Sequence, residues 1–254
     1  MLNKTKIEWC DVTWNPVTGC LHKCVYCYAR KTASRFAAKN IRDSGSTNKY
    51  VLDKPARGAS GKKEPYPFGF FPTYHRYRLD EPQDSQNPLT IFVCSMADLF
   101  GLWVPDEWIE EVFAACKKAP QHRYLFLTKN PARYILLAQA GKLPERDNFW
   151  FGSTATNSRM PFFFADQYHT FVSCEPIEGP ILTGDSSSTE PVDINVDWLI
   201  LGAETGNRKG KIVPRHEWFR QTVEDFQKIG KPVFMKDSLI PIVGEENMLR
   251  QLPW

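Results

Sequence analysis

Residues 11–30 read DVTWNPVTGCLHKCVYCYAR, a stretch that contains an apolar run, a loop with three cysteines and the start of a helix. The run Asp11–Asn15 carries β-branched and aromatic residues, which is typical of a buried strand. The helix that follows the loop is expected to span Tyr28–Asn40. A strand, a loop and a helix in this order form the repeating unit of α/β folds.

The same order of strand, polar turn and helix recurs along the chain. Each expected strand is apolar on both faces, as parallel strands covered by helices are. The alternation predicts an α/β fold, a partial (βα)6-type TIM-like barrel with one additional C-terminal strand, in a single domain over residues 1–254. The expected strands are Asp11–Asn15, Leu89–Ser95, Tyr124–Thr128, Phe149–Thr154, Thr170–Cys174, Trp198–Gly202 and Pro232–Met235, and the later helices are Asp106–Lys118, Ala132–Ala140 and His216–Ile229.

Residues 42–86 break this order and predict a long insertion or lid after the first helix. Cations interleaved with aromatic side chains can bind a phosphate backbone and stack bases. The alternative is a solvated loop whose aromatic side chains pack against the barrel. The cations are Lys49, Lys54, Arg57, Lys62, Lys63, Arg76 and Arg78, and the aromatic residues are Tyr50, Tyr66, Phe68, Phe70, Phe71, Tyr74 and Tyr77.

The composition sets wide limits on the class of protein. The net charge of +3 over 254 residues is too small to identify a nucleic-acid partner. No apolar run reaches membrane-spanning length, and the first residues lack the apolar core of a secretion signal. Unpaired thiols without an export signal predict a cytoplasmic protein with no membrane partner.

The three cysteines of the opening stretch have the spacing C-x3-C-x2-C, with Tyr26 directly before the third. Three thiolates so close can bind three corners of a [4Fe–4S] cluster, since cysteine is the usual iron–sulfur ligand. The fourth iron then has no protein ligand and is open to chemistry. We therefore predict Cys20, Cys24 and Cys27 as the metal ligands.

Two other readings of these cysteines stay open. Cys10 and His22 could complete a closed tetrahedral zinc site, although structural zinc sites usually pair two short ligand knuckles. A disulfide framework is weaker, because the seven cysteines are odd in number and spread through a long chain.

The cysteine motif resembles that of the radical S-adenosylmethionine (SAM) superfamily. In that superfamily the open iron chelates the methionyl amine and carboxylate of SAM. The resemblance implies a [4Fe–4S] cluster and SAM as cofactors, and it implies that Tyr26 packs near the adenine. It also predicts that the expected barrel is of the radical SAM kind.

Functional side chains of βα barrels gather where strands end, at the carboxyl face. A SAM carboxylate favours a cation, its amine favours carboxylates, and its ribose favours hydroxyl, amide or carboxylate groups. Each candidate could instead be a helix cap or a surface residue. The candidates are Lys129 for the carboxylate, Ser153, Thr154 and Asn157 for the ribose, and Ser95, Asp98, Glu175 and Glu204 for the amine or ribose.

The other cysteines give one catalytic candidate. Cys174 ends an expected strand, and a thiol at a radical site can donate a hydrogen atom. Cys94 lies near the end of another expected strand and could act in the same way. The alternative is packing in the core, since free cysteine behaves as a small hydrophobic residue. Cys10 and Cys116 are expected to be structural on the same argument.

Several further stretches, in one order along the chain, resemble the phage Gp37/Gp68-like family, also called DUF5131 or the three-Cys-motif family. The family is grouped with radical SAM proteins, and the resemblance implies a three-Cys-motif partner protein. A distant similarity to spore-photoproduct-lyase-like enzymes implies a nucleic-acid substrate. The stretches are Thr5–Trp9, Thr13–Cys20, Ala97–Phe100, Leu127–Pro131, Cys174–Pro176, Asp197–Gly206 and Val233–Lys236, with Pro72, His75, Arg78 and Leu79 as a P-x-x-H-x-x-R-L match.

The chain departs from radical SAM enzymes at one point. The exit of the second expected strand has Ser95-Met96-Ala97-Asp98 where a Gly-Gly-Glu motif is common, so the residue that binds the SAM amine stays open. The prediction is a radical SAM enzyme that needs an electron donor and acts on nucleic acid. The alternatives are a radical SAM enzyme that modifies a protein or peptide partner and a zinc-binding adaptor without catalytic activity.

Overall fold

The computed structural model describes residues 2–37, 41–43, 46–48, 50–181 and 195–254. The chain forms two compact units, Met1–Pro144 and Glu145–Trp254. The first unit contains β1 (Asn3–Lys4), β2 (Val12–Trp14), β3 (Val17–Thr18), α1 (Tyr28–Arg35), β4 (Ile41–Asp43), β5 (Ser46–Asn48), β6 (Val51–Leu52), β7 (Arg57–Gly58), β8 (Thr73–His75), β9 (Thr90–Val93), α2 (Asp106–Lys118), β10 (Arg123–Thr128) and α3 (Ala132–Gln139), with 3-10 turns at Arg76–Arg78 and Glu81–Asp84.

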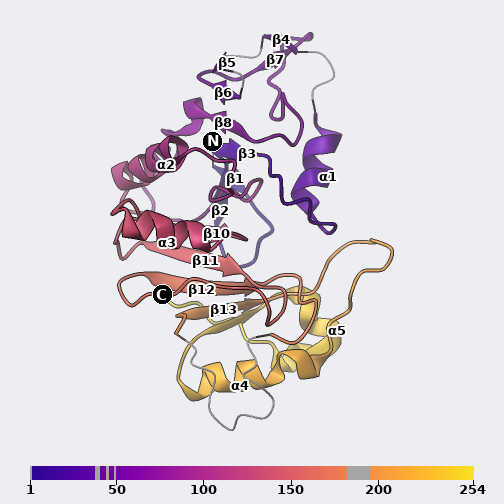
Figure 1. The fold of residues 1–254 in the computed structure, drawn as a ribbon. Coiled ribbons are helices and arrows are strands. Elements are labelled where there is room, and N and C mark those ends of the chain that lie inside the picture. Colours follow the sequence, from indigo (N-terminus) through magenta and orange to yellow (C-terminus); the bar gives the residue numbers. More distant parts are fainter. Residues whose placement is uncertain (1, 38–40, 44–45, 49, 182–194) are drawn as a thin grey trace. The chain divides into compact units, whose positions relative to one another are not determined.

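The main sheet of the first unit places β2, β9 and β10 side by side and parallel, with β1 antiparallel at its edge (Figure 1). Helix α2 lies on this sheet, and its Phe113 packs against Phe126 of β10 and Phe100 of the β9–α2 loop. Acidic residues in the first turn of α2 and lysines in its last turn complement the helix dipole.

The segment 42–86 is folded onto this unit. Strand β8 pairs with β3, which directly precedes the cysteine loop, and with β6. Tyr74 of β8 is fully buried, stacks on Trp108 of α2 and donates a hydrogen bond to Glu111 at 2.8 Å. At Tyr74 the structure therefore agrees with the expectation that aromatic side chains of this segment pack inward.

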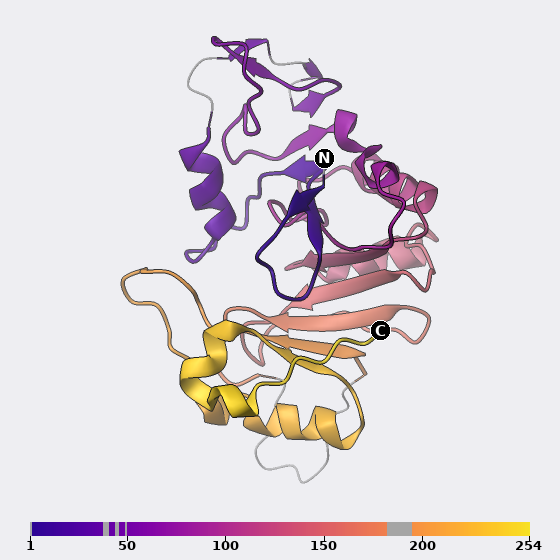
Figure 2. The same ribbon diagram turned by 180° about the vertical axis from the view of Figure 1, so that it is seen from behind.

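The second unit has four parallel strands in the order β11-β12-β13-β14. Helix α4 covers one face, where Val223 and Phe226 pack on apolar side chains of the strands (Figure 2). The last residues pair with β14, and Trp254 packs against Trp150 and Trp198. The elements are β11 (Phe149–Thr154), β12 (His169–Cys174), β13 (Trp198–Leu201), α4 (Arg220–Lys228), β14 (Val233–Met235) and α5 (Ile240–Val243), with 3-10 turns at His216–Trp218, Asp237–Leu239 and Glu245–Asn247.

The α/β class is confirmed, and each of the seven expected strands is present as β2 or β9–β14. Helix α2 has the predicted bounds, α3 ends one residue early and α4 begins after a 3-10 turn. Helix α1 ends at Arg35, short of the predicted Asn40, because the chain turns at Phe36; residues 38–40 lie outside the described residues. Closure into a partial barrel and the single domain over 1–254 stay predictions.

None of the described helices combines the length and apolar character needed to cross a membrane. The cytoplasmic location stays a prediction.

Candidate functional site

The cysteine loop begins at Gly19, which has a φ of +88°. Its N–H donates to the carbonyl of Met96 at 2.9 Å, so the loop starts at the carboxyl end of β9. The next N–H, of Cys20, donates to the carbonyl of Phe70 at 3.2 Å. The loop is therefore held between the exit of β9 and the 66–71 part of the inserted segment.

The three predicted ligands, Cys20, Cys24 and Cys27, are unpaired thiols and are partly exposed. Cys27 caps helix α1, and its sulfur accepts a hydrogen bond from the N–H of Arg30 at 3.3 Å. Burial raises the pKa of the Cys20 thiol to about 12, against an opposing hydrogen bond from the backbone N–H of His22, and the Asp98 carboxylate adds a smaller raising effect.

The chemistry of this donor set fits an iron–sulfur cluster. Three thiols come from one short loop. A thiol that coordinates a metal is deprotonated, because the metal takes the place of its proton. Within the described ranges, no group of three or more His, Cys, Asp and Glu side chains is gathered as the site of a single metal ion. The fit rests on the identity and placement of the donors.

The closed zinc site expected as an alternative is contradicted for its Cys10 ligand. Cys10 precedes Asp11, whose N–H donates to the carbonyl of Thr90 at the start of β9. The cysteine loop lies at the other end of β9, whose four residues span about 13 Å at ~3.3 Å per residue. The Nε2 atom of His22 is also engaged, at 2.7 Å from Asp98 Oδ2.

Asp98 is 5% exposed and lies at the centre of the site in the first unit. Its Oδ1 accepts the N–H of Phe100 and the hydroxyl of Thr128, and its Oδ2 accepts His22 Nε2 and the N–H of Lys129. A carboxylate has about four lone-pair directions. Donors from this chain occupy all four of these directions.

Lys129 lies beside the aromatic residue of the cysteine motif. Its Nζ is 5.6 Å from the centre of the Tyr26 ring, and it forms no hydrogen bond or ion pair with any residue that the structure describes. An unpaired, partly buried cation at this position suits an anionic ligand group. Ser95 is nearby, where its carbonyl accepts the Tyr28 hydroxyl and its own hydroxyl donates to Asn15 Oδ1.

In the second unit, polar side chains collect on one face of the sheet at its carboxyl end. Thr154 pairs with Ser173, and Ser173 pairs with Ile200, so these residues share a face. On the same face, the carboxylate of Glu175 accepts the hydroxyl of Ser173 at 3.0 Å and lies 2.7 Å from Lys236 Nζ. The predicted residues Thr154 and Glu175 are thus brought together.

Ser153 and Cys174 lie on the opposite face, under α4. Ser153 pairs with Val172, and its hydroxyl accepts the N–H of Phe163 at 2.9 Å. Cys174 is fully buried in the apolar cluster with Leu201 and Val223, and burial raises the pKa of its thiol. This placement supports the expectation of core packing and argues against hydrogen-atom donation from Cys174.

The last two predicted SAM ligands are held by local contacts. Asn157 Oδ1 accepts the N–H of Arg159 at 3.0 Å, which forms a turn after β11. Glu204 is 9% exposed and pairs with Arg208 through two hydrogen bonds of 2.7 and 2.6 Å. Lys236 and Arg208, which complete these ion pairs, were not among the predicted site residues, although Lys236 directly follows a predicted strand.

The predicted cations of the inserted segment differ in their contacts. Arg57 donates to the carbonyl of Gly61 at 2.7 Å. Arg76 pairs with Asp53 and Glu111, and Arg78 donates to the carbonyl of Asn15. Lys54, Lys62 and Lys63 are exposed, and Lys49 lies outside the described residues.

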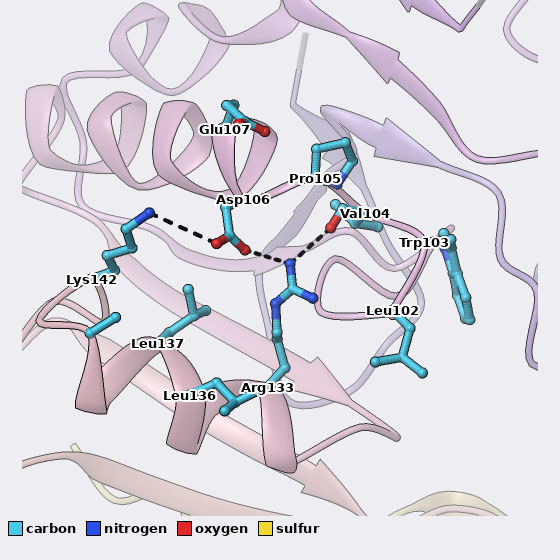
Figure 3. Close-up of a pocket in the computed structure, with 11 residues that line it drawn as sticks. Leu102, Trp103, Val104, Pro105, Asp106, Glu107, Arg133, Leu136, Leu137 and Lys142 are labelled. Carbon is cyan, nitrogen blue, oxygen red and sulfur yellow. Dashed lines mark hydrogen bonds and ion pairs between the residues drawn. The ribbon is translucent and has the colours of Figure 1, made fainter.

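A pocket of about 590 Å³ lies between the start of α2 and helix α3 in the first unit (Figure 3). Arg133 lies in it and donates to Asp106 at 2.5 Å and to the carbonyl of Val104 at 2.9 Å. None of the predicted site residues lines this pocket, and its cations Arg133 and Lys142 both pair with Asp106.

Comparison with known proteins gives a family and a fold. The model of a family described as "Protein of unknown function (DUF5131)" matches residues 4–239. Spore photoproduct lyase complexed with dinucleoside spore photoproduct has a similar structure, with a TM-score of 0.50, 10% identity, and coverage of 92% of this chain and 78% of that chain. A mutant of the same lyase with bound AdoMet and dinucleoside spore photoproduct has a TM-score of 0.44 and 11% identity, with coverage of 92% of this chain and 58% of that chain.

No curated protein matches the chain. At these identities the first structural match shows a shared fold. The family name Gp37/Gp68 stays a prediction.

Proposed function

The chain belongs to the DUF5131 family, and we propose that it is a radical SAM enzyme whose [4Fe–4S] cluster is bound by Cys20, Cys24 and Cys27. The observation that carries the proposal is the arrangement of three unpaired thiols on one loop at the carboxyl end of parallel strands, beside the unpaired cation of Lys129. Carboxyl ends of parallel strands are where α/β proteins bind ligands. The fold that the chain shares with spore photoproduct lyase is consistent with this proposal.

A reduced cluster held by Cys20, Cys24 and Cys27 would supply one electron for the cleavage of SAM into methionine and a radical able to take a hydrogen atom from the substrate. The chain's own part is to bind and orient. Lys129 binds the carboxylate of SAM, and Tyr26 packs near its adenine. Thr154 and Glu175 stay candidates from the sequence for the ribose or amine.

We propose nucleic acid as the substrate class. Lys54, Lys62 and Lys63 of the inserted segment are exposed, and exposed cations bind phosphate backbones. Spore photoproduct lyase, which has the similar fold, was solved with a dinucleoside spore photoproduct. An electron donor is a required partner, and a three-Cys-motif protein is a proposed one. Modification of a protein or peptide is the second candidate.

The test is anaerobic reconstitution with iron and sulfide, followed by SAM and a reductant. The wild type is expected to form 5′-deoxyadenosine, and Cys24→Ala is expected to form none. Cys10→Ala is the matched control, because it also removes one partly exposed thiol but lies at the other end of β9, and it should retain activity. Zinc in place of iron and sulfide, or equal product from Cys24→Ala, would refute the proposal.

A further inference from the structure

We propose that Asp98 is a positioning residue that holds the cysteine loop and Lys129 in place, and that it is not a ligand of SAM. The inference rests on the proposed function, because it concerns how the chain prepares the sites of the cluster and of the SAM carboxylate. It begins from the four hydrogen bonds that occupy both oxygens of this buried carboxylate.

One pair of these bonds fixes the carboxylate itself. Oδ1 accepts the N–H of Phe100 at 3.0 Å and the hydroxyl of Thr128 at 2.8 Å. Phe100 is fully buried and packs against Phe113, Phe126 and Tyr134. Side chains in a close-packed core move little, so Oδ2 is presented at a fixed position.

The two hydrogen bonds to Oδ2 connect Asp98 to the cysteine loop and to Lys129. Oδ2 accepts His22 Nε2 at 2.7 Å and the backbone N–H of Lys129 at 3.0 Å. His22 lies between Cys20 and Cys24, so its bond ties the middle of the cysteine loop to the exit of β9. A carboxylate can only accept, so Nε2 carries the hydrogen. One oxygen therefore sets the position of both the loop and Lys129.

A second contact keeps the His22 ring in this orientation. Its ring lies 4.8 Å from the ring of Trp103 in an edge-to-face arrangement. Residues that hydrogen-bond and orient metal-binding groups typically affect metal affinity by about 10–100-fold. An effect of that size is expected here, although His22 is not one of the proposed ligands.

The experiment compares matched variants of the full chain after anaerobic reconstitution. His22→Phe keeps an aromatic ring against Trp103 and removes the donor to Asp98, whereas His22→Gln keeps a donor and removes the ring. We expect His22→Phe to lose iron to a chelator roughly 10–100-fold faster than wild type. His22→Gln should recover most of this loss. If His22→Gln loses iron as fast as His22→Phe, the hydrogen bond is not the cause and the inference is overturned.

Asp98→Asn separates positioning from direct binding. An amide cannot accept from all four donors, so we expect faster iron loss together with a weaker change in the EPR spectrum of the loaded protein on addition of SAM. If Asp98→Asn keeps its cluster as well as wild type and loses only the SAM response, Asp98 is a SAM ligand and the inference is overturned. Asp106→Asn, a carboxylate at the pocket near α3 and outside the proposed site, should retain iron as well as wild type.

The controls distinguish the two levels of failure. Thermal unfolding of the metal-free variants checks that each one folds, and His22→Phe should be close to wild type because the His22 side chain is 23% exposed. A folded wild type that takes up no iron and sulfide refutes the proposed function and this inference with it. A loaded wild type with an equally stable cluster in His22→Phe refutes this inference alone.

Discussion

Among single residues, Gly19 carries the tightest constraint on the cysteine loop. A Cβ at this position would lie 2.3 Å from the carbonyl oxygen of Phe71, and its φ of +88° disfavours any side chain. The neighbouring N–H of Cys20 donates to Phe70. The glycine therefore allows the inserted segment and Cys20, the first proposed metal ligand, to lie in contact.

Gly19→Ala is expected to lower the free energy of unfolding by about 3 kcal/mol or more, because strain and a backbone clash add. Gly61→Ala is the matched control, since Gly61 also has a positive φ but nothing within 4 Å of an added Cβ. It should lose only about 1–2 kcal/mol. Urea unfolding measures both, and equal losses would show that the contact with Phe71 is unimportant.

Lys129 is the residue whose loss should separate SAM binding from cluster binding. Lys129→Gln removes the unpaired cation beside Tyr26 and leaves the backbone N–H to Asp98 intact. We expect SAM affinity to fall roughly 10-fold or more, as for loss of a charge-assisted contact, with iron content unchanged. Titration of the loaded protein with SAM checks this. Lys142→Gln, at the pocket near α3, should bind SAM as the wild type does.

His75 predicts a pH dependence of stability. It is fully buried, and burial, then the Arg78 guanidinium, hold its pKa well below the usual 6.5. As the pH falls, His75 of the unfolded chain takes up a proton before His75 of the folded chain. The stability that the neutral, buried ring contributes is therefore complete above about pH 6.5 and is lost below it. The free energy of unfolding should then fall by up to ~1.4 kcal/mol for each pH unit.

The measurement is urea unfolding between pH 7 and pH 5. His75→Gln should remove this part of the slope, while His216→Gln, at an exposed position, should leave it unchanged. A wild-type slope that survives in His75→Gln would assign the effect to other groups.

At the scale of the elements, the inserted segment is attached to the sheet rather than free. Strand β8 pairs with β3, and Tyr74 reaches α2 through both its ring and its hydroxyl. A lid that opens as a whole would have to break these buried contacts. Motion, if the function needs it, is expected in the exposed part around Lys62 and Lys63.

Tyr74→Ala is expected to lower the free energy of unfolding by about 3–5 kcal/mol, as truncation of a buried aromatic residue does. Tyr74→Phe keeps the ring and loses one hydrogen bond, and about 1 kcal/mol is expected. Chemical unfolding gives both values. If the two variants are equally stable, the ring does not anchor the segment to α2.

For the whole molecule, the net charge of +3 makes any nucleic-acid binding depend on local clusters of cations. Replacing Lys54, Lys62 and Lys63 by Gln should weaken single-stranded nucleic-acid binding. The slope of log K against log salt concentration should become shallower by up to about 2. Lys117→Gln with Lys118→Gln, at the exposed end of α2, is the control of similar charge loss.

Fluorescence anisotropy at several salt concentrations measures this slope. An unchanged slope in the triple variant would remove the inserted segment from the proposed substrate site. Binding of a polypeptide in its place would favour the protein-modifying alternative.

The order of strands and helices and the three-thiol loop could be read from the sequence alone. Apolar periodicity and ligand spacing are local properties, so the seven expected strands, helix α2 and the placement of Cys20 after a strand followed without long-range information. The spacing also separated these three cysteines from Cys116, which is buried in the core.

Only the tertiary structure decided what each polar residue does, because a side chain's face and partners depend on register and on contacts between distant residues. Strand register turned Cys174 and Ser153 away from the face that carries Glu175. A hydrogen bond between residues 76 positions apart joins His22 of the cysteine loop to Asp98, a predicted SAM ligand, and this contact could not be read from the sequence. A buried carboxylate needs hydrogen-bond donors around it, and which residues supply those donors is decided only when the chain has folded.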